Sequence, residues 1–157
     1  MGNGEKRKLS AEEVVVSGVL TDHKLMFNGD RRFRLVDGES GAYAGMAVIT
    51  EGAWANSHYH KNVIEIVAVI KGWVAFAELK DGKLNIRILR ENESLTLCHP
   101  GLPHNMYMSA NTRMVGIKLA GTTVNNPSEV DWYASPEMDA LTKHLTEEQI
   151  LALAIKV

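Results

Sequence analysis

The chain has 157 residues, with 17 Lys or Arg against 19 Asp or Glu, for a net charge of −2. This balance lacks the basic surplus of a nucleic-acid-binding protein. The apolar runs are short and interrupted, so we expect no membrane-spanning segment. The polar N-terminus lacks the apolar centre of a secretory signal, and the single cysteine, Cys98, cannot form an internal disulfide. We therefore expect a cytoplasmic protein that binds neither nucleic acid nor membranes.

The first part of the chain has the pattern of a β domain. Residues 1–10 are expected to form a flexible N-terminal arm, and residues 11–157 a single domain with a barrel over about 14–120. The Asp81-Gly82 pair between two alternating runs is the strongest hairpin signal. Short apolar runs between turn residues predict strands near 14–20, 32–37, 43–50, 55–60, 64–71, 73–80, 83–90, 94–98, 104–108 and 112–119. Many short strands with few helices predict an all-β sandwich or barrel.

The tail, about residues 135–157, has helical signals instead. Ser135 followed by Pro136 is typical of an N-cap and a first helical residue, and Thr146 with Gln149 has the spacing of a capping box. We predict two short helices over about 136–144 and 147–155. The residues expected to pack these helices on the barrel or on a second subunit are Leu141, Leu145, Ile150, Leu153 and Ile155.

Two histidines and a glutamate in the middle of the chain form a possible metal site. His58 and His60 are two residues apart, so on a strand both imidazoles lie on the same face. Glu65 follows within an apolar run, where an unpaired carboxylate would be costly. Two imidazoles and one carboxylate suit Fe(II) or catalytic zinc. From these residues alone, a surface histidine pair and a glutamate paired with Lys or Arg remain open alternatives.

The same residues resemble the first motif of the cupin superfamily. The match consists of Gly52, five residues, His58-Tyr59-His60, four residues, Glu65, six residues and Gly72. A second cupin motif should follow within a few tens of residues. The segment ENESLTLCHPGLPHNMYM is similar to it, with Gly101 and His104 in place. It departs from the motif at three positions, which are Glu93 for glycine, His99 for proline and Met108 for asparagine.

The resemblance implies a double-stranded β-helix, or jelly-roll barrel, as found in small single-domain cupins. It also implies a divalent metal (Fe, Zn, Mn or Ni) held by His58, His60, Glu65 and His104. We expect a metal-dependent enzyme of dioxygenase or isomerase/epimerase type that acts on a small polar metabolite; its catalytic residues are not identified. The alternatives are a non-catalytic ligand- or metal-binding cupin and a metal-independent sugar isomerase or epimerase.

Further expectations concern residues near this site and the assembly. Arg32 and Arg34 either lie on a solvated face or reach toward an anionic substrate. Lys118 either pairs with Glu78 or another acid, or contacts substrate, and His99 is either a partner of the site or an exposed turn residue. Met106 and Met108 share the strand parity of His104 and either line the pocket or fill the core. The resemblance also implies a homodimer, through an outer β face or a strand near Val14 to Leu20.

Overall fold

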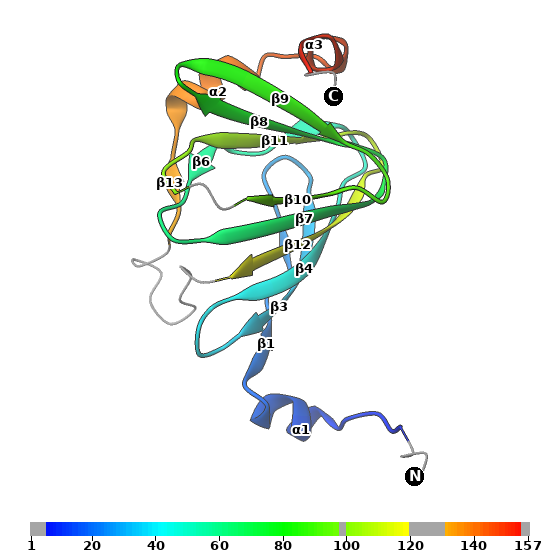
Figure 1. Ribbon diagram of the computed structural model, residues 1–157. Helices are drawn as coiled ribbons and strands as arrows, with labels where there is room; N and C mark the ends of the chain where they lie inside the picture. The colour runs from blue at the N-terminus through cyan, green and yellow to red at the C-terminus, as the bar shows by residue number, and fades with distance from the viewer. Residues whose placement is uncertain (1–5, 98–99, 120–130, 155–157) are drawn as a thin grey trace, which may run out of the picture.

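The computed structural model of the chain describes residues 6–97, 100–119 and 131–154. Its strands form two antiparallel sheets that face each other (Figure 1), so the all-β prediction is confirmed. The first sheet has the order β1-β3-β4-β12-β7-β10 with β2 beside β3, and the second has the order β13-β6-β11-β8-β9 with β5 beside β11. The first sheet comprises β1 Val19–Thr21, β2 Lys24–Leu25, β3 Arg31–Asp37, β4 Tyr43–Val48, β7 Ile64–Lys71, β10 Ser94–Leu97 and β12 Arg113–Leu119. The second comprises β5 Ala53–Trp54, β6 His58–Tyr59, β8 Val74–Lys80, β9 Lys83–Leu89, β11 His104–Met108 and β13 Tyr133–Ala134.

Two apolar clusters hold these layers together. The first fills one part of the space between the sheets and contains Ala47, Ile49, Val67, Val69, Val74, Leu89 and Met108. The second lies on the outer face of the second sheet, under the C-terminal helices, and contains Trp54, Ala75, Ala77, Ile86, Tyr107, Met138 and Ile150. The strands of the second sheet therefore bury apolar side chains on both faces, as β8 shows with four consecutive buried residues.

The tail forms the two helices that the sequence predicts, α2 (Pro136–Thr142) and α3 (Glu147–Leu153). The capping box of α3 is present, whereas Ser135 makes no side-chain capping bond to α2. Ile150 is fully buried and Leu145 packs beside the same cluster. Leu141 and Leu153 are 38% and 55% exposed, so the expectation that they pack is wrong, and Ile155 lies outside the described residues. Short helices expose one face because only the other meets the sheet.

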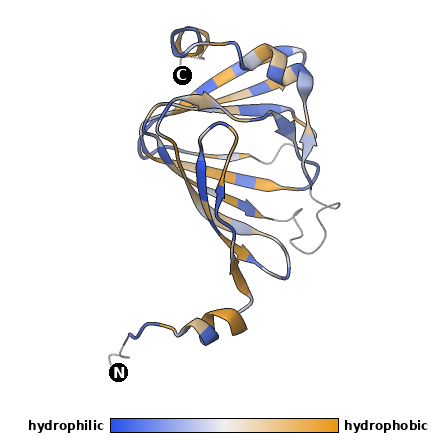
Figure 2. Cartoon of the chain, turned by 180° about the vertical axis from the view of Figure 1, so that it is seen from behind, coloured by the Kyte–Doolittle hydropathy of each residue, from blue (hydrophilic) through white to orange (hydrophobic). Residues whose placement is uncertain are grey.

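The N-terminal region differs from the prediction. The expected strand over 14–20 begins as a helix, α1 (Ala11–Val16), and β1 starts only at Val19. The cause is local, because Ser10 and Glu13 form a reciprocal capping box that satisfies the first amides of the helix. In Figure 1, α1 extends away from the two sheets, and Figure 2 shows that its last turn is strongly apolar.

Among the other local predictions, some are confirmed and some differ from the structure. The Asp81-Gly82 turn joins β8 to β9, and both residues have positive φ, +52° and +71°, as a two-residue hairpin turn requires. Of the expected strand over 55–60 only β6 (His58–Tyr59) forms, β5 lies just before this range, and β13 was not predicted. Cys98 lies outside the described residues. Among the described helices, none is long and apolar enough to cross a membrane.

Candidate metal centre

The four side chains singled out by the two motifs lie together between the sheets. His58 and His104 are opposite each other on β6 and β11 of the second sheet, and His60 follows β6 directly. Glu65 comes from β7 of the first sheet. One ligand atom from each of the four residues can be chosen so that all lie within 4.8 Å of one another. Closure of the barrel therefore brings imidazoles from one sheet to a carboxylate from the other.

Backbone carbonyls orient the three imidazoles. In each ring Nδ1 lies within hydrogen-bond distance of a carbonyl oxygen, and the pairs are His58 with Asn56, His60 with Asp131 and His104 with Leu102. A carbonyl only accepts, so Nδ1 carries the proton in all three neutral rings. Nε2 is then unprotonated, which is the form of imidazole that binds a metal.

This tautomer places unprotonated nitrogens close to one another, and two polar atoms of the cluster have no partner among the described residues. The Nε2 atoms of His58 and His60 are 3.1 Å apart, and two lone pairs at that distance repel unless a cation or proton lies between them. His104 Nε2 and Glu65 Oε2 are buried and have no hydrogen-bond partner within the described ranges. Buried polar atoms normally have partners, because leaving them unpaired costs free energy. Three imidazole nitrogens and one carboxylate oxygen around one point fit a divalent first-row metal.

The electrostatics keep this donor set in its metal-binding protonation state. Burial lowers the pKa of His58 to about 3, with further lowering by the nearby His104 and Lys118. Burial also lowers the pKa of His104, although Glu65 opposes the shift. For Glu65 burial raises the pKa, but Lys118 and the neighbouring histidines outweigh this effect and hold the pKa below its ordinary value. At neutral pH His58 and His104 are therefore uncharged and Glu65 is ionised.

Lys118 is a fifth member of the cluster. Its Nζ lies 3.2 Å from His60 Nε2 and 3.8 Å from Glu65 Oε1, and its side chain is 12% exposed. The pairing follows from the sheet register, which places Lys118 on β12 directly opposite Glu65 on β7. From the sequence we expect Lys118 to pair with Glu78 or another acid, or to contact substrate. The partner in the structure is Glu65 and not Glu78. The ammonium balances the buried carboxylate and lies within contact distance of two of the four candidate ligands.

A short segment after residue 130 holds the histidine strand in place. The Asp131 carboxylate accepts hydrogen bonds from the amides of Lys61 and Asn62, at 2.7 and 2.6 Å. Next to it, Trp132 stacks on the ring of His58, with centroids 5.3 Å apart. The following residues form β13, which pairs with β6. We call residues 131–134 the strap, because they fix β6 and the residues directly after it, which carry two of the four candidate ligands, His58 and His60.

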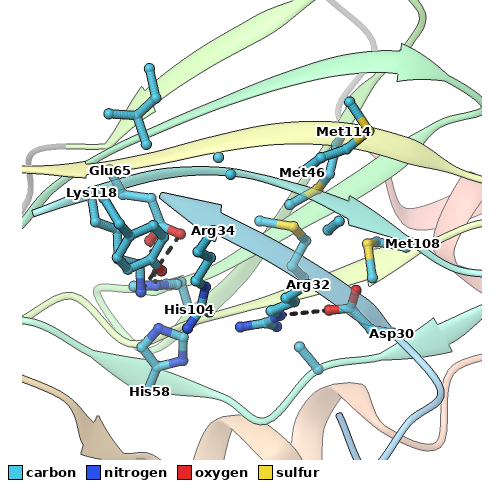
Figure 3. A pocket seen from close by; sticks show the side chains of 17 residues that line it. Asp30, Arg32, Arg34, Met46, His58, Glu65, His104, Met108, Met114 and Lys118 are labelled. Carbon is cyan, nitrogen blue, oxygen red and sulfur yellow. Dashed lines mark hydrogen bonds and ion pairs between the residues drawn. The ribbon is translucent and has the colours of Figure 1, made fainter. Parts of the chain in front are cut away.

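A pocket between the sheets opens onto the cluster. Its lining includes His58, Glu65, His104 and Lys118 at the cluster, and four methionines, Met46, Met106, Met108 and Met114. It also includes Arg32 and Arg34 from β3 (Figure 3), so the solvated face considered for these arginines is wrong. Arg34 is held over the Tyr43 ring and lies 3.7 Å from Asp22, while Arg32 pairs with Asp30. Three cations thus face two carboxylates, Asp30 and Glu65, in the pocket lining.

Sequence reasoning did not find Asp30 or the strap. For Asp30 a signal existed, since it alternates with Arg32 and Arg34 and so shares their face. For Asp131 there was none, because it lies 71 residues from the histidine that its carbonyl contacts. His99 lies outside the described residues.

Several solved structures have a fold similar to that of this chain. Similar structures include the capsular polysaccharide assembling protein CapF from Staphylococcus aureus (15% identity, TM-score 0.58, 73% of this chain and 32% of that chain). They also include a variant of Bacillus subtilis oxalate decarboxylase (18%, 0.57, 87% and 38%) and KdgF from Halomonas sp. (16%, 0.53, 66% and 89%). The chain spans about a third of the length of CapF and of oxalate decarboxylase.

No protein-family model and no curated protein matches the chain. At these levels of identity, the structural likeness concerns the fold alone. It agrees with the two facing sheets and with the positions of both sequence motifs. The chain therefore has the cupin fold, the double-stranded β-helix that the two motifs predict.

Proposed function

We propose that the protein is a metal-dependent cupin enzyme whose divalent metal is bound by His58, His60, Glu65 and His104. The observation that carries this proposal is the convergence of three oriented imidazoles and one ionised carboxylate, with His104 Nε2 and Glu65 Oε2 left without hydrogen bonds in the described chain. A bound metal would supply a Lewis acid and open coordination positions for an oxygen ligand. The substrate proposed is a small polar metabolite that enters the adjoining pocket.

The charges of the pocket favour an anionic substrate. Arg32, Arg34 and Lys118 oppose only Asp30 and Glu65, so the lining carries one net positive charge before any metal binds. Lys118 lies close enough to the cluster to orient, or exchange a proton with, an oxygen held there. The likeness to oxalate decarboxylase concerns the fold. The name of that enzyme gives one example of a protein with this fold that acts on a small carboxylate.

Metal binding is the first test. Protein purified without a polyhistidine tag and stripped of metal is titrated with Fe(II), Zn, Mn and Ni, followed by elemental analysis. We expect one metal per chain, and His104→Ala should abolish stoichiometric binding, whereas the exposed His144→Ala should not. Retention of full affinity in His104→Ala would contradict the proposed site.

Activity is the second test, because the same site suits two reaction classes. Oxygen consumption of the Fe(II) protein with diols, thiols and keto acids tests the dioxygenase type, and proton exchange at carbon in deuterated water tests the isomerase/epimerase type. Turnover without metal would favour the metal-independent isomerase or epimerase. Metal and ligand binding without any turnover would favour the non-catalytic cupin.

We also propose that two copies of the chain form a homodimer through the outer face of the first sheet. Helices cover the outer face of the second sheet, whereas on the outer face of the first sheet Phe33 and Leu35 are 45% and 57% exposed. Such an apolar face is typical of an interaction site. Light scattering should give twice the 17.3 kDa of one chain, and Phe33→Asp should halve the mass. Leu151→Asp, on the exposed side of α3, is the matched control, and a monomeric wild-type mass would contradict the dimer.

A further inference from the structure

The pocket has a second polar group at its opposite end, formed by Asp30 and Arg32. In Figure 3 these two residues lie on one side of the pocket, and Glu65, Lys118, His58 and His104 lie on the other. The sheet register gives the separation. Arg32 is opposite Ala47, which is opposite Met114, and Lys118 is four residues further along β12. At about 3.3 Å per residue the two levels are about 13 Å apart along the strands.

Asp30 has an unused hydrogen-bond acceptor. Its side chain is 1% exposed, and Oδ2 accepts a hydrogen bond of 2.7 Å from Arg32 Nε. Oδ1 is buried and has no hydrogen-bond partner in the part of the chain that the structure describes. A buried carboxylate oxygen without a donor is costly, so this position calls for a donor from outside the chain.

Arg32 indicates which kind of donor group fits beside Asp30 Oδ1. Its guanidinium uses Nε for Asp30, and no hydrogen bond of its remaining N–H groups is found within residues 6–97, 100–119 and 131–154. A hydroxyl can donate to Asp30 Oδ1 and accept from Arg32 at the same time. An ammonium group can donate but cannot accept, and the Arg32 charge would repel it. The pair therefore fits a hydroxyl better than an amine.

Methionines line the pocket between and around the two ends. Met106 is two residues from His104 on β11, and Met108 and Met114 lie near the level of Arg32, so their flexible thioether side chains can adapt to a short carbon chain that reaches Asp30. The cluster end, with Lys118 and Arg34 beside the candidate metal ligands, suits an anionic oxygen head group. The lining as a whole thus has an anion-binding end and a hydroxyl-binding end, with methionines around the second.

We propose that Asp30 and Arg32 form a second binding subsite, which recognises a hydroxyl group at the far end of a small carboxylate bound by its head group at the metal centre. The proposal rests on the proposed function for the head group. It adds the substrate class, which is a short hydroxycarboxylate whose hydroxyl is remote from the carboxylate.

The test is a calorimetric titration of the zinc-loaded protein with two series of linear carboxylates. One series ends in a hydroxyl and the other in a methyl group, with lengths from about three to about eight carbons to cover the separation of the two ends. At the best length we expect the hydroxyl to tighten binding about tenfold or more, the range for a hydrogen bond to a charged group. The amine-ended analogue should gain less than the hydroxyl.

Two variants locate the effect. Asp30→Asn keeps the shape of the side chain, but its one oxygen is needed by Arg32, so the hydroxyl advantage should fall to about threefold or less. Asp22→Asn is the matched control, because Asp22 also pairs with an arginine of β3 but is not among the pocket residues. The ratio of hydroxyl to methyl affinity should be unchanged in this control.

The outcomes separate the two proposals. If the carboxylates bind the zinc-loaded protein and the metal-free protein equally well, the metal-centred function fails. If they need the metal but the hydroxyl brings no gain at any length, or the gain survives in Asp30→Asn, the subsite is wrong and the metal centre stands. If no carboxylate binds, the substrate class is wrong, and the metal titration alone then decides the proposed function.

Discussion

The inner face of β7 carries Val67 and Val69 at one end and Glu65 at the other, and this contrast extends across the barrel. Around the two valines the space between the sheets is filled by apolar side chains that are almost fully buried. Around Glu65 it contains three imidazoles, a lysine and two polar atoms that lack hydrogen bonds among the described residues. We call these regions the packed half and the polar half of the interior.

The packed half stabilises the fold, whereas the polar half lowers its stability. Apolar burial favours folding by about 25 cal/mol for each Å² removed from water. Buried charges and unpaired polar atoms oppose it, even when they are partly compensated. A protein keeps such groups where binding requires them. Substitutions in the packed half should therefore change stability, and those in the polar half should change binding.

The largest effect is expected for Glu65→Gln. Removing the charged donor should weaken metal affinity by more than about 100-fold, beyond the effect typical of residues that only support a ligand. The substitution keeps the side-chain volume, so the protein should remain folded. Glu78→Gln is the matched control, since Glu78 lies on the neighbouring strand opposite His104 but outside the four-residue cluster. Metal titration followed by calorimetry compares the two, and equal affinities would rule out Glu65 as a ligand.

In the packed half, Ile49→Ala should have the opposite profile. Ile49 is 2% exposed within the inner apolar cluster, so its truncation leaves a cavity. We expect a loss of about 2–5 kcal/mol in the free energy of unfolding, measured with urea. Metal affinity of the folded variant should stay within about twofold of wild type, since truncation removes no donor. A large loss of metal affinity would show that the two halves are coupled.

Asp131→Asn should have an intermediate effect, through the strap. An amide has one acceptor oxygen, so the amides of Lys61 and Asn62 cannot both keep their bonds. His60 would then be less firmly oriented, and we expect metal affinity to fall by about 10-fold to 100-fold. Asp37→Asn is the control, because Asp37 also accepts two hydrogen bonds, both at Oδ2 and both from Ser40, in a turn between β3 and β4. An unchanged affinity in Asp131→Asn would mean that the strap does not support the site.

The smallest effect expected is on the pH dependence of stability without metal. The pKa of His58 falls from an ordinary 6.5 to about 3 on folding, so between these values the unfolded chain binds more protons than the folded one. Stability then rises with pH across this window and is lost as the pH falls from 6.5 toward 3. The lowered pKa of His104 acts in the same direction, and that of Glu65 adds to it below 4.5.

Melting temperature is the measurement, with a shift of about 2–4 °C for each kcal/mol lost in a chain of this size. Comparing pH 7.5 with pH 5 should show a decrease for the metal-free wild type. The decrease should be smaller in His58→Gln, which cannot titrate, and unchanged in His144→Gln, whose histidine is exposed. Equal slopes in all three proteins would contradict the assignment to His58.

Much of the architecture was predictable from local sequence. Alternation and turn residues predict most of the strands, Asp81-Gly82 predicts the β8–β9 hairpin, and Thr146 with Gln149 predicts the start of α3. The motif spacing also selects the four residues that the structure brings together, although their binding of a metal stays a prediction. These features depend on neighbours in the chain or on fixed spacings, which a sequence displays directly.

Other features were decided only by the tertiary structure. The alternation on β3 shows that Arg32 and Arg34 share a face, but a period of two does not tell which face closes over the pocket. Lys118 finds Glu65 through the β12–β7 register, and Asp131 reaches the histidine strand from 71 residues away. Contacts between distant segments depend on how the sheets close, and no local pattern encodes that closure.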